Sequence, residues 1–306
     1  MKTNISLILI LCLLLGACKN GNASSQSKSE TPQDTIKAIK MPAIPQMMTA
    51  PEQRADFLAK HYWDNVNFAD TNYIHHPEVT EQAWADYCDL LNHVPLETAQ
   101  QAMRNVIDRT NVDKKVFTYI TDLADKYLYD PNSPMRNEEF YIPVLEAMIA
   151  SPVLNETEKI RPQARLKLAQ KNRIGTKALN FTYTLASGAQ GSLYQLKAEY
   201  LLLFINNPGC QACTETIEGL KNAPIINQLL QEKKLVLLSI YPDEELDEWK
   251  KHLSEFPNEW INGYDKKFTI KEEQVYDLKA IPTLDLLDKD KTVLLKDATA
   301  PAIEAY

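Results

Sequence analysis

A short apolar run, followed after a four-residue turn by a pair of cysteines, is the feature that most restricts how this chain can fold. Residues 201–205 are all apolar, as expected for a strand buried on both faces of a sheet. Four turn-forming residues end the run: Asn206, Asn207, Pro208 and Gly209. Cys210 and Cys213 follow in a helix-compatible stretch that continues to Leu220, and a second apolar run covers residues 235–240. Strand, helix and strand in this order predict two parallel strands joined by a right-handed crossover.

The place of the cysteine pair, where a buried strand meets a helix, suits thiol–disulfide chemistry. Unpaired backbone N–H groups and the positive end of a helix stabilise a thiolate at such a junction. Cys210 is therefore predicted to be the exposed nucleophile, and Cys213, one turn later, the more buried thiol that resolves a mixed disulfide. A structural disulfide and half of a zinc site are the alternatives. The disulfide would close only a small loop, and zinc would need about four ligands, for which the sequence offers no second pair.

The amino-terminal segment accounts for two of the five cysteines. Lys2 precedes a nearly unbroken apolar run at residues 5–15, which fits the core of a signal peptide but is shorter than the ~20 residues that span a bilayer. The run ends in Leu-Gly-Ala-Cys, which resembles the lipobox of bacterial lipoproteins. Residues 1–17 are therefore predicted to be a lipoprotein signal peptide that carries Cys12 away on cleavage, and Cys18 is predicted to be lipidated. An ordinary signal peptide or a buried helix is the alternative.

Residues 18–50 are predicted to form a flexible tether, because they begin with a polar stretch of low complexity. In lipoproteins, a lysine directly after the lipidated cysteine, here Lys19, is usual for transfer to the outer membrane. Known signals for export to the cell surface need acidic residues just after that cysteine, and the first acidic residue here is Glu30. The expected location is the cell envelope, with the protein lipid-anchored at the outer membrane and facing the periplasm.

Residues 51–172 place apolar side chains at helical spacing and are predicted to form an all-α domain. Cys88 lies within one of these apolar stripes, between Trp84 and Leu91. It is interpreted as a small buried hydrophobic residue. A third redox thiol would need exposure and a positive neighbourhood, whereas Cys88 is followed directly by Asp89.

The charge balance and the histidines argue against two other classes of function. Asp and Glu outnumber Lys and Arg by 41 to 33, which gives a formal net charge of −8 and no electrostatic reason to bind nucleic acid. The five histidines show no metal-ligand spacing: His61, His75, His76, His93 and His252. We therefore expect no metal site, no cofactor and no nucleic-acid partner.

Residues 173–306 change to a strand-like pattern and carry two motifs: Pro-Gly-Cys-Gln-Ala-Cys at residues 208–213, and Ala-Ile-Pro-Thr at residues 280–283, before the last predicted hairpin. With these two motifs, this part of the chain resembles a thioredoxin-like domain of the TlpA/ResA type. The resemblance implies an α/β domain with a central mixed sheet flanked by helices, which here follows an all-α domain. That all-α domain resembles the uncharacterised DUF5106 type, which is often fused to such domains in bacterial lipoproteins.

The resemblance also implies which residues form the site. In domains of this type the proline of the Ile-Pro-Thr motif has a cis peptide bond and lies against the cysteine pair, and Pro282 is the matching residue. Ile281 would offer its backbone groups to the substrate chain. The catalytic residues would be Cys210 and Cys213, and the substrate-binding residues would be Ile281, Pro282, Thr283, Gln211 and Ala212.

Three departures from the family pattern restrict what the resemblance implies. Gly209 replaces the tryptophan that usually precedes the first cysteine. The dipeptide between the cysteines is Gln-Ala rather than Gly-Pro, so a redox potential cannot be transferred. Phe204 stands where thioredoxin has a buried acid, six residues before its nucleophile, which leaves the proton acceptor for Cys213 unassigned.

Together these observations predict a membrane-anchored periplasmic thiol–disulfide oxidoreductase. Cys210 would attack a disulfide in an exported protein, and Cys213 would resolve the mixed disulfide. The Ile-Pro-Thr motif and the resemblance to the TlpA type favour reduction over oxidation, and in an oxidising compartment a membrane electron donor would have to re-reduce the pair. The alternative is a thioredoxin-like binding module of a lipoprotein complex without redox turnover, because a fold does not determine a function.

Overall fold

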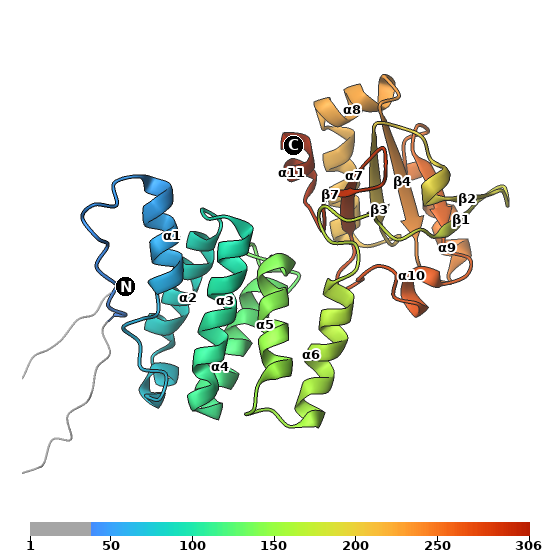
Figure 1. Cartoon of the computed structure of the whole chain (residues 1–306). Coiled ribbons are helices and arrows are strands. Elements are labelled where there is room, and N and C mark those ends of the chain that lie inside the picture. Colours follow the sequence, from blue (N-terminus) through green and yellow to red (C-terminus); the bar gives the residue numbers. More distant parts are fainter. Residues whose placement is uncertain (1–37) are drawn as a thin grey trace, which may run out of the picture. The chain divides into compact units, whose positions relative to one another are not determined.

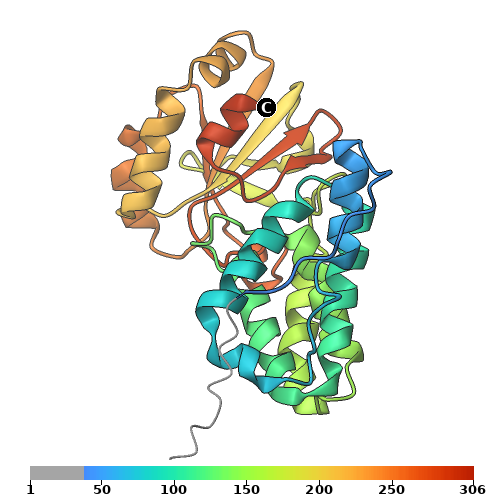
Figure 2. The same ribbon diagram turned by 90° about the vertical axis from the view of Figure 1, so that its left-hand side faces the viewer.

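The computed structural model describes residues 38–306, which form a helical region followed by a sheet with flanking helices (Figure 1). The predicted signal peptide, the lipidation site Cys18 and the predicted tether as far as residue 37 lie outside the described residues. Figures 1 and 2 show the helices of the first region packed side by side. Their bounds are α1 Pro51–His61, α2 Pro77–Leu91, α3 Leu96–Arg109, α4 Lys114–Ala124, α5 Glu138–Ala150 and α6 Glu156–Ala169.

Side-chain caps fix where two of these helices begin. Asn137 accepts the backbone N–H of Phe140 at 3.3 Å, which starts α5 and places Glu138 and Glu139 in its first turn. Carboxylates are favoured there by the positive end of the helix. Asn155 starts α6 with a capping box, in which side chain and backbone bond reciprocally across the first turn.

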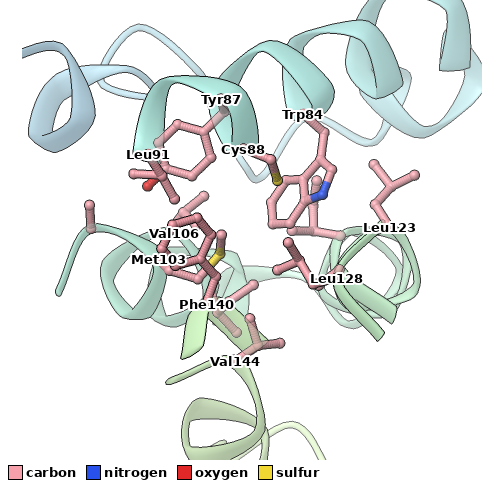
Figure 3. Close-up of a cluster of buried hydrophobic side chains, with 14 of the residues drawn as sticks. Trp84, Tyr87, Cys88, Leu91, Met103, Val106, Leu123, Leu128, Phe140 and Val144 are labelled. Atoms are coloured by element: carbon pink, nitrogen blue, oxygen red, sulfur yellow. The ribbon is translucent and has the colours of Figure 1, made fainter. Parts of the chain in front are cut away.

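The helices of this region share one apolar core, and Cys88 belongs to it (Figure 3). Trp84 and Tyr87 on α2 are fully buried, and Cys88 beside them is 2% exposed. Figure 3 shows Cys88 pointing into the same cluster as Met103 of α3 and Leu128, which follows α4. Burial raises the pKa of the Cys88 thiol well above its ordinary value. The interpretation of Cys88 as a core residue is therefore confirmed.

The second region is built on a seven-stranded mixed sheet in the order β2-β1-β5-β4-β3-β6-β7. β3 pairs in parallel with β4, and β4 with β5, while the other neighbours are antiparallel. The strands are β1 Thr182–Leu185, β2 Gln190–Ser192, β3 Tyr200–Ile205, β4 Leu235–Tyr241, β5 Ile261–Tyr264, β6 Thr283–Asp288 and β7 Val293–Leu295. The helices are α7 Gln211–Lys221, α8 Pro224–Gln231, α9 Leu246–His252, α10 Thr269–Glu272 and α11 Ala300–Ala305.

The central strand β3 is buried on both faces, which explains its continuous apolar sequence. Leu202 and Phe204 face a core shared with α7, α8 and α11, whereas Leu201, Leu203 and Ile205 face the core on the other side. Figure 1 shows helices on both sides of these strands. The predicted fold class, an all-α region followed by a thioredoxin-like mixed sheet flanked by helices, is confirmed. Within residues 38–306, no helix combines the length and apolar character that a bilayer span requires.

Candidate active site

The cysteine pair lies at the start of α7, directly after the loop that follows β3, as the sequence predicted. Cys210 is the residue that caps α7, and its Sγ accepts the backbone N–H of Cys213 at 3.4 Å. Gly209 before it has a φ of 71°, in the left-handed region that side chains other than glycine rarely adopt. A tryptophan at this position would be strained in this loop, which gives a physical reason for the departure from the family pattern.

Polar side chains fasten the loop in front of the cysteines to neighbouring elements. The buried Asn206 donates through Nδ2 to Oγ of Ser239 on β4 at 2.8 Å. Asn207 donates through Nδ2 to Oδ2 of Asp243 at 2.9 Å, and Lys271 of α10 donates to the other oxygen of Asp243 at 2.6 Å. The sequence indicated only a turn at these positions. Because the loop is fastened at both asparagines, it holds Cys210 in a defined place.

The strand register brings the second motif to the cysteine pair. β3 and β6 are antiparallel, with Ile205 opposite Thr283, so the residues just before β6 lie beside the loop that follows β3. The peptide bond between Ile281 and Pro282 is cis. Cys210 Sγ lies 3.8 Å from the carbonyl oxygen of Ile281. A substrate chain that reached Cys210 would therefore meet the backbone at Ile281.

The remaining predicted substrate-binding residues divide into exposed and buried ones. Gln211 and Ala212 are exposed in the first turn of α7, and Gln211 donates through Nε2 to Oε1 of Glu215 at 2.8 Å. Thr283 is only 7% exposed, and its hydroxyl donates to the carbonyl of Ala280 at 2.8 Å. The Thr283 side chain therefore shapes the loop around Pro282 rather than facing a substrate.

The two thiols differ in exposure, and this difference separates their chemical roles. Both are free in this structure, with Cys210 partly exposed and Cys213 only 2% exposed. Burial raises the pKa of Cys213 to about 12, and the adjacent Cys210 also raises it, although a hydrogen bond from the Asn207 backbone acts in the opposite direction. Cys213 is thus a protonated thiol at neutral pH, and Cys210 is the thiol within reach of a substrate.

No carboxyl group takes the place of thioredoxin's buried acid on the α7 side of the sheet in the described residues. Phe204 occupies that position, is fully buried, and packs edge-on against Trp260 with ring centroids 6.2 Å apart. The buried Asp285 of β6 lies opposite Leu203, so it points to the other face of the sheet. Burial, followed by the charge of Asp297, raises the pKa of Asp285 to about 7. Sequence reasoning missed Asp285, although a single acid among apolar residues of a strand was a visible signal.

The described residues contain no group of three or more His, Cys, Asp or Glu side chains that could hold a metal ion. The site geometry therefore consists of two thiols, the first turn of a helix and the backbone of the Pro282 loop. This combination supports the formation and release of a mixed disulfide.

Family models match both regions of the chain. Residues 17–172 match a domain of unknown function, DUF5106, which spans more than half of the 306 residues. The chain belongs to the DUF5106 family. Residues 198–293 of this DUF5106 protein match a thioredoxin-like family. The resemblance inferred from the two motifs and from the helical pattern is confirmed.

Solved structures from Bacteroides species are similar to the whole chain or to its second region. A thioredoxin-like protein from Bacteroides caccae ATCC 43185 is 83% identical, with a TM-score of 0.87 and coverage of 89% of this chain and 98% of that chain. The C-terminal domain of an uncharacterized protein from Bacteroides fragilis NCTC 9343 is 69% identical, with a TM-score of 0.44 and coverage of 44% and 96%. The thioredoxin domain of a thiol-disulfide oxidoreductase from Bacteroides vulgatus is 20% identical, with a TM-score of 0.39 and coverage of 44% and 96%. No curated protein matches the sequence.

Proposed function

We propose that this DUF5106 protein is a thiol–disulfide oxidoreductase that reduces disulfides of exported proteins. The observation that carries the proposal is the arrangement of the two thiols. Cys210 is partly exposed at the start of α7, 3.8 Å from the Ile281 carbonyl, and Cys213 is buried one turn behind it. A purely binding module has no need of an accessible thiol with a second thiol behind it.

The proposed reaction passes two electrons from the cysteine pair to the substrate. The Cys210 thiolate attacks one sulfur of the substrate disulfide, which breaks the substrate S–S bond, forms a mixed disulfide and releases one substrate thiolate. Cys213 then loses its proton and attacks Cys210 Sγ, which forms the Cys210–Cys213 disulfide and releases the second substrate sulfur. That departing sulfur takes the proton, because no carboxyl group is built against Cys213 on this side of the sheet in residues 38–306.

The cellular setting is proposed from the sequence. A protein anchored by a lipid on Cys18 and facing the periplasm would meet exported proteins directly. Because that compartment is oxidising, an electron donor in the membrane would have to return the Cys210–Cys213 disulfide to two thiols.

Cys18→Ala is expected to move the protein from the membrane fraction to the soluble fraction of the cell envelope. A lipid chain adds about 0.8 kcal/mol of membrane affinity per buried CH₂, and this contribution disappears when no thiol is present to carry the lipid. The measurement is fractionation of cells that express tagged full-length protein, with Cys88→Ala as a matched cysteine control. Retention of Cys18→Ala in the membrane at the wild-type level would contradict the anchoring proposal.

Cys213→Ser is expected to trap substrates as mixed disulfides and is the direct test of the proposed function. The variant keeps the nucleophile but lacks the thiol that releases the substrate, so an adduct on Cys210 accumulates. Reduced variant protein is incubated with insulin, and separately with envelope proteins, and adducts are identified by mass spectrometry under non-reducing conditions. The double variant Cys210→Ser/Cys213→Ser is the control and should form none. If Cys213→Ser forms no adduct with either mixture, the binding-module alternative is favoured.

A further inference from the structure

A buried cluster of charged side chains lies at the loop that leads into β6, residues 277–282, which carries Pro282. This cluster plays no part in the chemistry described so far. Its centre is Lys279, whose side chain is 6% exposed. The Lys279 Nζ lies 2.5 Å from Glu138, 2.9 Å from Asp297 and 3.5 Å from Asp277. Lys296 donates to the second oxygen of Glu138, also at 2.5 Å. Glu138 therefore binds two lysines of the thioredoxin-like region at once.

Glu138 belongs to the helical region, so this cluster joins the two regions at the loop. Glu138 stands in the first turn of α5, while Lys279 lies two residues before Ile281. Two hydrogen bonds also link side chains of the helical region to backbone carbonyls of the thioredoxin-like region. Arg136 donates to the Asp297 carbonyl at 2.5 Å, and Asn172 donates to the Val275 carbonyl at 2.8 Å. The segment that leads into Pro282 is thus held by side chains from outside the thioredoxin-like fold.

The burial of this cluster makes its partners interdependent. Burial alone would lower the pKa of Lys279, but Asp297, Glu138 and Asp277 outweigh it and raise that pKa above its ordinary value. Without the Glu138 carboxylate, Lys279 keeps Asp297 and Asp277, but both of these lie in the thioredoxin-like region. The ion pair that ties Lys279 to α5 is then lost, and the segment that carries Lys279 is free to shift away from α5.

We propose that Glu138, acting through Lys279, is a positioning residue that holds the backbone of Ile281 beside Cys210 for a substrate chain. The inference rests on the proposed function and assigns a task to the DUF5106 region, which is to set the substrate-binding loop of the thioredoxin-like region. Glu138 does not touch the reacting sulfur atoms. Its effect is therefore confined to substrates that use the Ile281 backbone.

The test compares two disulfides that differ in their need for the loop. Insulin presents a polypeptide chain that meets the Ile281 backbone, whereas 5,5′-dithiobis(2-nitrobenzoic acid) is a small disulfide without a polypeptide backbone. For full-length Glu138→Gln, we expect kcat/KM with insulin to fall about tenfold or more, since small misplacements of binding groups have effects of this size. The rate with the small disulfide should stay within about twofold of wild type, because the reacting thiols are unchanged.

Glu139→Gln is the matched control. Glu139 is the next residue of the same turn and is similarly buried, but its carboxylate pairs with Arg173 rather than with Lys279. This variant loses the same charge and should reduce insulin at nearly the wild-type rate. Lys279→Met should also lower insulin activity, and the double variant Glu138→Gln/Lys279→Met should lose less than the two single losses combined, because both changes remove the Glu138–Lys279 ion pair.

Hydrogen exchange supplies a readout that does not depend on activity. In Glu138→Gln, the backbone amides of residues 277–281 and of Thr283 should exchange faster than in wild type, while those of β3 and β4 should not. Unchanged exchange in that segment, or an equal loss with both disulfides, would overturn the inference and leave the proposed function intact. A wild-type protein that reduces neither disulfide would overturn the proposed function, and the inference with it.

Discussion

Cys210→Ser is expected to lower the rate of insulin reduction to the rate that dithiothreitol gives alone. The serine hydroxyl is not a nucleophile toward disulfides at neutral pH, so the first S–S exchange cannot begin. Cys213 cannot take over this task, because it is 2% exposed and burial raises its pKa to about 12.

The insulin assay follows the precipitation of the reduced B chain with dithiothreitol as the electron source. Cys88→Ala is the control, since it removes a thiol from the helical core and leaves the candidate site untouched. It should retain the wild-type rate. Equal rates for wild type and Cys210→Ser would show that the protein does not catalyse this reaction, and the oxidoreductase proposal would then be wrong.

Trp84→Ala is expected to lower the free energy of unfolding of the helical region by about 3–5 kcal/mol. Trp84 is fully buried and lies among aromatic rings, with centroids 6.1 Å from both Trp63 and Tyr87. Truncation to alanine removes these contacts and leaves a cavity that the surrounding helices can fill only in part. A loss of this size is a large share of the 5–15 kcal/mol that stabilises a typical domain.

Urea unfolding followed by circular dichroism at 222 nm measures this effect through the helices. Ile160→Ala on α6 is the matched control, because Ile160 is 61% exposed and its truncation should change the free energy of unfolding by no more than about 0.5 kcal/mol. A loss below about 1 kcal/mol for Trp84→Ala would show that this tryptophan is not central to the core.

Features that depend on neighbours along the chain were predictable from the sequence. The apolar run at residues 201–205 predicted a strand buried on both faces, and β3 spans Tyr200–Ile205. The stripe around Cys88 predicted a core position, and Cys88 is buried in α2. These predictions succeed because the periods of a helix and a strand are local properties of the backbone, and an apolar side chain is stable only on the face that is buried.

The sequence motifs predicted which residues form the candidate site. They did not predict the features of the site that depend on packing, namely side-chain burial and backbone angles. The motifs at residues 208–213 and 280–283 indicated which residues meet, through the family resemblance. They did not indicate that the side chain of Thr283 is buried or that Gly209 has a φ of 71°. Exposure and backbone angles within a loop depend on what packs against it, and no short-range pattern encodes that.

The sequence by itself determined the strand–helix–strand unit around the two thiols and the change from a helical to a thioredoxin-like region, but not strand β5 or helix α10. Only the tertiary structure decided that Glu138 meets Lys279, a pair separated by 141 positions in the chain, and that this pair lies at the loop before Pro282. From the sequence alone, a charged residue is expected to be exposed to solvent, because charges are stable in water. Burial with partners from distant elements reverses that expectation, and such partners are found only when the chain is folded.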